Sequence, residues 1–242
     1  MHTANIWYQL YLRSCKIGIV LLLLESFSAQ AQDRVAINDA KFAKRKFHFG
    51  IQVGFNVADF KIRHSENFIY NDSILGVNTK AGPGFNLHIL GSLHLSKNFE
   101  LRMIPGVAFS ERHLIYDIRD GAPVDKKLES IVVETPVHIK FKSDPINDFK
   151  IYVFAGMKYG YDMASNSKAR RAEDLVKLNK HDWSVDYGFG FEIHFPLFIL
   201  APEFKVSNGL INIHTPDPHL SYSRVLQGLR SRTFLFSINF EG

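Results

Sequence analysis

The stretch FHFGIQVGFNV, residues 47–57, decides the fold. Every odd position in it carries a large apolar side chain, and every even position carries His, Gly, Gln or Asn. Side chains on a β-strand alternate between its two faces with a period of two, so the stretch predicts a strand with one apolar and one polar face.

Seven further stretches follow the same alternation, which predicts eight strands in all. Each is close to the length of about nine to eleven residues that a tilted strand needs to cross a bilayer. The predicted strands are 47–57, 85–95, 99–109, 131–141, 149–161, 183–193, 198–206 and 234–240.

The connections between these strands alternate in length. Short turns are expected at 96–98, 143–148 and 195–197, and long connections at 61–83, 113–129, 163–181 and 207–230. Short turns at one end and long loops at the other are typical of outer-membrane barrels, whose short turns face the periplasm and whose long loops face the cell exterior.

The volume of the apolar face indicates which face meets lipid. Eight strands close around an interior that is only wide enough to be filled by side chains, so the many large apolar residues cannot all fit inside. The polar face, which is rich in glycine, fits there. We therefore predict an all-β, eight-stranded antiparallel transmembrane barrel with apolar residues toward lipid; a lipocalin-like soluble barrel is the alternative.

Aromatic residues gather at both predicted ends of the strands, as in the two aromatic belts of a barrel at the bilayer interfaces. At the short-turn ends they are Phe47, Phe99, Phe141, Phe149, Phe198 and Phe240, and near the long-connection ends Tyr159, Tyr161, Trp183 and Tyr187.

The N-terminal region predicts export. Arg13 and Lys16 precede the apolar run 17–24, and a small-residue cleavage site ends near Ala31. This is the pattern of a secretory signal peptide. We expect a signal peptide at 1–31, a periplasmic tail at 32–45 and an outer-membrane barrel at 46–242.

Composition narrows the function of the mature chain. Removal of residues 1–31 takes away the only cysteine and leaves a net charge of +4. Disulfides, thiolate metal sites and a cysteine nucleophile are thereby excluded. The mild positive charge gives no argument for a nucleic-acid partner.

Charged residues of both signs share the polar alternation and are expected to form ion pairs that fill the lumen, for example Glu134 with Lys140. They are Glu100, Arg102, Glu134, Lys140, Lys158, Asp186, Glu192, Glu203 and Lys205. A proton or ion path through these residues is the alternative.

Histidines occur in the same alternation and in the last long connection. Those on the predicted strands are His48, His88, His94, His138 and His194; His214 and His219 flank two prolines in the connection. Imidazole is a common metal ligand, but no paired spacing on one element supports a metal site. We expect the five strand histidines to fill the lumen and the segment from His214 to His219 to form a stiff surface loop, and we assign no catalytic, cofactor-binding or metal-binding residue. No cofactor or small-molecule substrate is identified.

Four ordered stretches resemble the PorT family of outer-membrane barrels: 82–87 (GPGFNL), 101–112 (LRMIPGVAFSER), 134–143 (ETPVHIKFKS) and 159–165 (YGYDMAS). The resemblance covers about 46–242. It implies a non-enzymatic component or assembly factor of the type IX protein secretion system, associated with gliding motility, and it supplies no catalytic residues.

The expected partners follow from this resemblance and from the lipid-facing surface. They are outer-membrane lipid and other type IX secretion proteins, for which the mixed apolar and charged stretches 68–72 and 220–226 are candidate contacts. Packing of these stretches over the mouth of the barrel is the alternative. A small outer-membrane enzyme, a hydrolase or acyltransferase acting on lipid A or phospholipid, is the alternative function.

Overall fold

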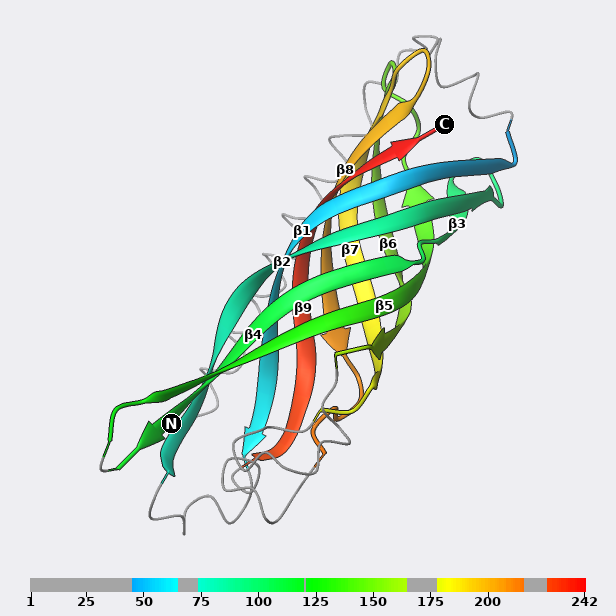
Figure 1. The fold of residues 1–242 in the computed structure, drawn as a ribbon. Helices are drawn as coiled ribbons and strands as arrows, with labels where there is room; N and C mark the ends of the chain where they lie inside the picture. Colours follow the sequence, from blue (N-terminus) through cyan, green and yellow to red (C-terminus); the bar gives the residue numbers. More distant parts are fainter. Residues whose placement is uncertain (1–44, 65–73, 120, 165–177, 216–225) are drawn as a thin grey trace, which may run out of the picture. The chain divides into compact units, whose positions relative to one another are not determined.

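The described part of the chain forms nine antiparallel strands that close into a barrel (Figure 1). The computed structural model describes residues 45–64, 74–119, 121–164, 178–215 and 226–242. The predicted signal peptide 1–31 and the tail 32–45, apart from Arg45, lie outside these ranges. The strands are β1 (Phe47–His64), β2 (Ile74–His94), β3 (Phe99–Met103), β4 (Gly106–Ile118), β5 (Val124–Lys142), β6 (Phe149–Asp162), β7 (His181–His194), β8 (Ile199–Gly209) and β9 (Leu226–Glu241). The ring closes because β1 pairs with both β2 and β9.

β3 and β4 are two parts of one strand. Both pair with β5 in a single register, from Phe99 opposite Phe141 to Tyr116 opposite Val124. The break lies at Ile104 and Pro105, where the Ile104 N–H still donates to the carbonyl of Pro136 at 3.0 Å. Proline has no N–H to add to the ladder. The barrel is therefore eight-stranded, as the alternation predicts.

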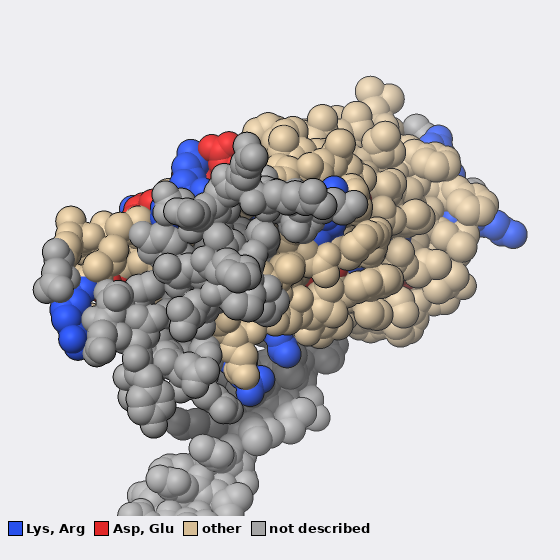
Figure 2. Space-filling view, turned by 60° about the horizontal axis from the view of Figure 1, so that its bottom comes forward, with Lys and Arg blue, Asp and Glu red and all other residues tan. Residues whose placement is uncertain are grey.

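Apolar side chains cover the outside of the barrel, and polar ones lie inside it. On β1, Phe49 is 68% exposed whereas its neighbour His48 is buried, and on β2, Ile89 is 66% exposed whereas His88 is buried. A soluble barrel has the reverse arrangement, so the lipocalin-like alternative is wrong. In Figure 2, Lys and Arg lie mainly toward the two ends of the lateral surface, and a wide zone between them is almost entirely tan. No helix among the described residues is long and apolar enough to cross a membrane.

The predicted aromatic belts are present at both ends of the apolar zone. At the short-turn end, Phe99 packs on Phe141 with ring centres 5.1 Å apart, and Phe198 lies 6.3 Å from Phe240. At the other end, the rings of Tyr159 and Trp183 are 5.1 Å apart.

Two of the predicted long connections are largely strand. The region predicted as 61–83 contains the end of β1 and the first part of β2, and the region 113–129 contains the β4–β5 hairpin. Part of the reason is a β-bulge between Ala81 and Gly84 that shifts the register of β2 against β4. Beyond it, even-numbered residues such as Lys80 face outward, and the odd-position pattern ends although the strand continues.

The polarity of the two faces is reversed beyond the apolar zone. There the inward side chains are apolar and form a cluster, which we call the apolar cap, and the outward ones are polar. The cap consists of Phe60, Val77, Leu114, Tyr116, Leu178, Ile213, Leu226 and Leu229. Where a strand leaves lipid for water, its apolar side chains are buried inside the barrel. The prediction that apolar side chains face outward therefore does not identify these ends of the strands.

Glycines make room for two aromatic rings inside the barrel. Tyr152 and Phe154 of β6 are buried, and they lie directly opposite Gly190 and Gly188 of β7. A Cβ atom at Gly188 would lie 2.7 Å from Cζ of Phe154, and one at Gly190 would overlap the Tyr152 ring. The lumen is thus filled by aromatic as well as charged side chains.

Candidate functional site

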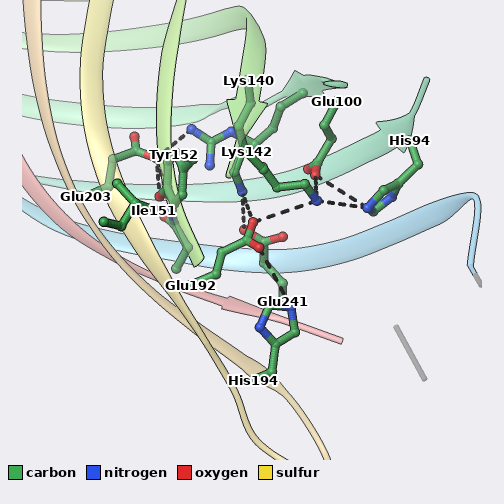
Figure 3. Close-up of polar contacts among 12 residues, drawn as sticks. His94, Glu100, Lys140, Lys142, Ile151, Tyr152, Glu192, His194, Glu203 and Glu241 are labelled. Carbon is green, nitrogen blue, oxygen red and sulfur yellow. Dashed lines mark hydrogen bonds and ion pairs between the residues drawn. The ribbon is translucent and has the colours of Figure 1, made fainter. Parts of the chain in front are cut away.

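The short-turn half of the lumen holds two lysines of β5 among three carboxylates (Figure 3). Lys140 Nζ lies 2.5 Å from Glu192 and 3.9 Å from Glu241. Lys142 Nζ donates to Glu100 at 2.6 Å and lies 2.9 Å from Nε2 of His94. The side chains come from strands that are far apart in the sequence, so the pairs tie the ring together across its interior.

The middle of the lumen is centred on Glu203 of β8. Its Oε2 accepts from Arg102 at 2.5 Å, from the Tyr152 hydroxyl at 3.0 Å and from Asn239 at 3.3 Å. The Arg102 guanidinium also lies 5.1 Å from the centre of the Phe154 ring. Arg102 and Glu203 are both fully buried, so their pairing satisfies two charges that would be costly alone.

A third group of charges lies nearer the long-connection end. Glu134 of β5 contacts Nζ of Lys158 at 2.9 Å and Nε2 of His88 at 3.0 Å. Asp186 of β7 contacts Nε2 of His138 at 3.1 Å and Nζ of Lys205 at 3.4 Å.

All nine charged residues predicted for the lumen lie inside the barrel and belong to these three groups, which we call the lumen ion network. The expected pairing of Glu134 with Lys140 is wrong: Glu134 pairs with Lys158, and Lys140 with Glu192. The sequence reasoning missed Lys142 and Glu241, which share the inward alternation of β5 and β9 but lie one residue beyond the counted strand ends. It also missed Tyr152.

The histidines on the strands are lumen residues, as expected, and they are distributed over the network rather than gathered. His88 and His138 each contact one carboxylate, and the rings of His48 and His94 lie 4.7 Å apart. No group of three or more His, Cys, Asp or Glu in the described ranges is arranged to hold a metal ion. His214 is buried, which lowers its pKa, so the first residue of the predicted surface loop is not exposed. His219 lies outside the described residues.

A polar cavity of about 40 Å³ separates the lumen ion network from the apolar cap. Its lining includes Arg112, Glu134, Lys158 and Asp182. This volume has room for only a few water molecules. Ion pairs on one side and the apolar cap on the other leave no wide passage along the lumen through the described residues.

The outer face of the β4–β5 hairpin, beyond the apolar zone, carries its own charge cluster. His113 lies between Asp125 (2.8 Å) and Glu111 (2.8 Å), and Lys127 contacts Glu111 at 2.7 Å and Glu129 at 3.1 Å. The hydrogen bond to Asp125, followed by that to Glu111, raises the pKa of His113. The hydrogen bond from Lys127 lowers the pKa of Glu111.

The contacts of five histidines bear on the enzyme alternative. His88, His94, His113, His138 and His181 bond to carboxylates, Lys142 or Tyr159, and none of these bonds is to a serine. Ser231 donates to Asp182. These residues therefore supply no Ser–His–acid arrangement of the kind that a hydrolase uses.

The expected contact stretches are only partly described. Residues 68–72 and 220–225 lie outside the described ranges. Leu226, the last residue of the second stretch, is buried in the apolar cap, so that position is not an exposed contact residue.

A closed antiparallel ring with an apolar outer face and a filled polar lumen defines a small outer-membrane barrel. The chain belongs to the outer membrane protein beta-barrel domain family, whose model matches residues 29–215. It is an integral protein of the outer membrane. No curated protein sequence matches the chain.

Solved structures of small barrels resemble this fold. The outer membrane protein OprG of Pseudomonas aeruginosa aligns with a TM-score of 0.50 and 13% identity over 80% of this chain and 94% of that one. Neisserial surface protein A aligns with a TM-score of 0.39 and 12% identity over 81% and 96% of the two chains. Ail, the attachment invasion locus protein of Yersinia pestis, aligns with 0.36 and 13% over 82% and 100%.

Proposed function

We propose that this protein is a non-enzymatic component or assembly factor of the type IX secretion system and acts through contacts with other secretion proteins. The observation that carries the proposal is the filled lumen. Arg102, Lys140 and Glu203 are fully buried in the lumen, and the apolar cap covers the network beyond them. Such a barrel has no room for a protein substrate, so its outer surfaces and ends are what remain for function.

The assignment to this secretion system rests on the PorT-like stretches 82–87, 101–112, 134–143 and 159–165. In the barrel, the second spans β3 and the first part of β4, and the third lies on the adjacent β5. Two of the four stretches thus form one paired wall, whose inward residues include Arg102, Glu134 and Lys140. The resemblance therefore falls partly on residues that build the lumen ion network.

We propose the orientation that the connection lengths favour, with the short turns in the periplasm and the long connections outside. Both described ends of the barrel carry exposed polar groups, such as the Lys97–Asp144 pair at the short-turn end and the charge cluster on the β4–β5 hairpin. These are the surfaces on which secretion partners are expected.

The test combines deletion with complementation. Deletion of the gene should abolish export of type IX cargo. A variant with Arg102→Met and Glu203→Gln, expressed at the wild-type level, should restore export because the lumen is not the conduit. A tagged wild-type barrel extracted in mild detergent should recover other secretion proteins. Intact export in the deletion strain, together with recovery of no secretion component, would end the proposal.

A further inference from the structure

The outward face of β1 and β9 changes character just beyond the apolar zone. Val57 opposite Phe234 is the last apolar pair of this face. The next outward pair is Asp59 opposite Arg232, and the one after it is Lys61 opposite Arg230, followed on β1 by Arg63. We call Asp59, Lys61, Arg63, Arg230 and Arg232 the β1–β9 basic face.

The charges on this face do not balance. Arg232 donates to Asp59 at 3.1 Å, which uses the only carboxylate of the face. Lys61, Arg63 and Arg230 are exposed and form no ion pair with another described residue. Lys61 and Arg230 lie directly opposite each other on neighbouring strands, a position at which like charges destabilise a sheet. An anion between them would remove that cost.

Other outward faces at the same end of the barrel differ. On β4 and β5, the cations are matched by carboxylates, as in the pairing of Lys127 with Glu111 and Glu129. On β6 and β7, the corresponding positions hold the aromatic residues Tyr159 and Trp183. Lys80 of β2 is also exposed and forms no ion pair with another described residue, so positive charge without a carboxylate partner is concentrated on β1 and β9 and extends to Lys80.

The first pair of the basic face lies at the height of the headgroup layer, and the second pair lies just above it. A strand rises about 3.4 Å per residue and tilts by about 40° in such a barrel, so Asp59 and Arg232 lie about 5 Å, and Lys61 and Arg230 about 10 Å, above the last apolar pair. The headgroup region of a leaflet is about 5–7 Å thick. Long Lys and Arg side chains that bend back along the strand place their charges within this layer.

We propose that the β1–β9 basic face binds the phosphate group of a lipid in the leaflet at the long-connection end, with the phosphate between Lys61 and Arg230. The guanidinium supplies two parallel donors to phosphate oxygens and the ammonium adds a point charge. The acyl chains of the same lipid lie against Val57 and Phe234 below. This inference does not depend on the proposed role in secretion.

The test measures lipid binding to the full barrel in a sugar-headed, phosphate-free detergent. The barrel is titrated with bis-phosphorylated lipid A and with the same lipid after removal of its phosphates, and bound lipid is counted by native mass spectrometry. The wild-type protein should prefer the phosphorylated form. Each cation near an anionic headgroup is worth about a fivefold change in affinity, so Lys61→Gln with Arg230→Gln should weaken binding about 30-fold.

The matched control is Arg119→Gln with Lys127→Gln, which removes two exposed cations from the β4–β5 hairpin at the same end and should change binding less than about twofold. Circular dichroism verifies that each variant is folded. Equal binding of the two lipids, or an equal loss in the control variant, would overturn the proposal. Inorganic phosphate should compete only weakly; competition as strong as that of the lipid would show a free-phosphate site and would also overturn it.

Discussion

The Arg102–Glu203 pair offers a direct test of the lumen ion network. Both side chains are fully buried, and each has the other as its only ion-pair partner among the described residues. Removal of one member of a buried pair leaves the other charge without compensation and costs about 3–5 kcal/mol. We therefore expect Arg102→Met to lower the free energy of unfolding by about 3–5 kcal/mol. Glu203→Gln should cost a similar amount, because it leaves the buried charge of Arg102 unpaired. The hydrogen bonds from Tyr152 and Asn239 can still form to the glutamine oxygen.

The double variant should cost much less than the sum of the two single changes. Replacement of a whole buried pair by neutral groups of similar volume is often close to neutral, so we expect a loss of about 1 kcal/mol and a coupling energy of about 5 kcal/mol or more. The assay is urea unfolding in detergent micelles, followed by the fluorescence of Trp183. As a control, Lys97→Gln breaks an exposed pair, 77% and 71% exposed, and should cost less than about 1 kcal/mol. Additive single and double effects would refute the pairing.

Gly188→Val should lower the free energy of unfolding by about 1–3 kcal/mol in the same assay, since a new side chain there meets the backbone carbonyl of Phe204 and the buried ring of Phe154. Gly121→Ala, where nothing lies within 4 Å of a new Cβ, should change it by less than about 0.5 kcal/mol. The hydrogen bond that His113 donates to Asp125 raises the pKa of His113 above 6.5, so its stabilisation of the hairpin is complete below pH 6.5 and is lost as the pH rises through the raised pKa. As the pH rises through the raised pKa, amide hydrogen exchange in the hairpin should quicken more in the wild type than in His113→Gln. An equal change with pH in the two proteins would contradict the assignment. A cysteine at Gly121 should react with an impermeant label on intact cells while one at Asn98 should not; the reverse pattern would invert the proposed orientation. Planar bilayers containing the barrel should show no large conductance, and a wide open channel would refute the filled lumen.

Strand number and facing follow from the sequence because lipid imposes a strict rule on every outward position. Residues 47–57 alternate without exception, and their outward side chains are those exposed in the structure. The rule applies only within the bilayer. Phe60 and Leu114 lie beyond it and face inward, so the alternation predicts neither the outer halves of β1 and β4 nor the apolar cap.

The pairing of the lumen charges could not be predicted from alternation alone. Alternation places Glu134, Lys140 and Lys158 on the same inner face, but it gives neither the stagger of the strands nor the reach of a lysine across the ring. Glu134 and Lys158 meet because β5 and β6 are neighbours with Pro136 opposite Lys158, two residues from Glu134. Lys140 instead meets Glu192 of β7, two strands away. Such contacts depend on the register and on the curvature of the closed ring.

The lumen ion network and the apolar cap both fill the barrel, but they do so with different chemistry. The lumen ion network lies at the depth of the bilayer, where each charge needs a partner and a single substitution is costly. The apolar cap lies beyond the bilayer and resembles the core of a soluble protein, because burial of its apolar surface away from water stabilises it. Neither the network nor the cap uses the outward charges of the β1–β9 basic face or of the β4–β5 hairpin. Substitutions on those outward faces should therefore alter lipid or protein contacts without unfolding the barrel, whereas substitutions in the lumen should alter folding without changing which partners are bound.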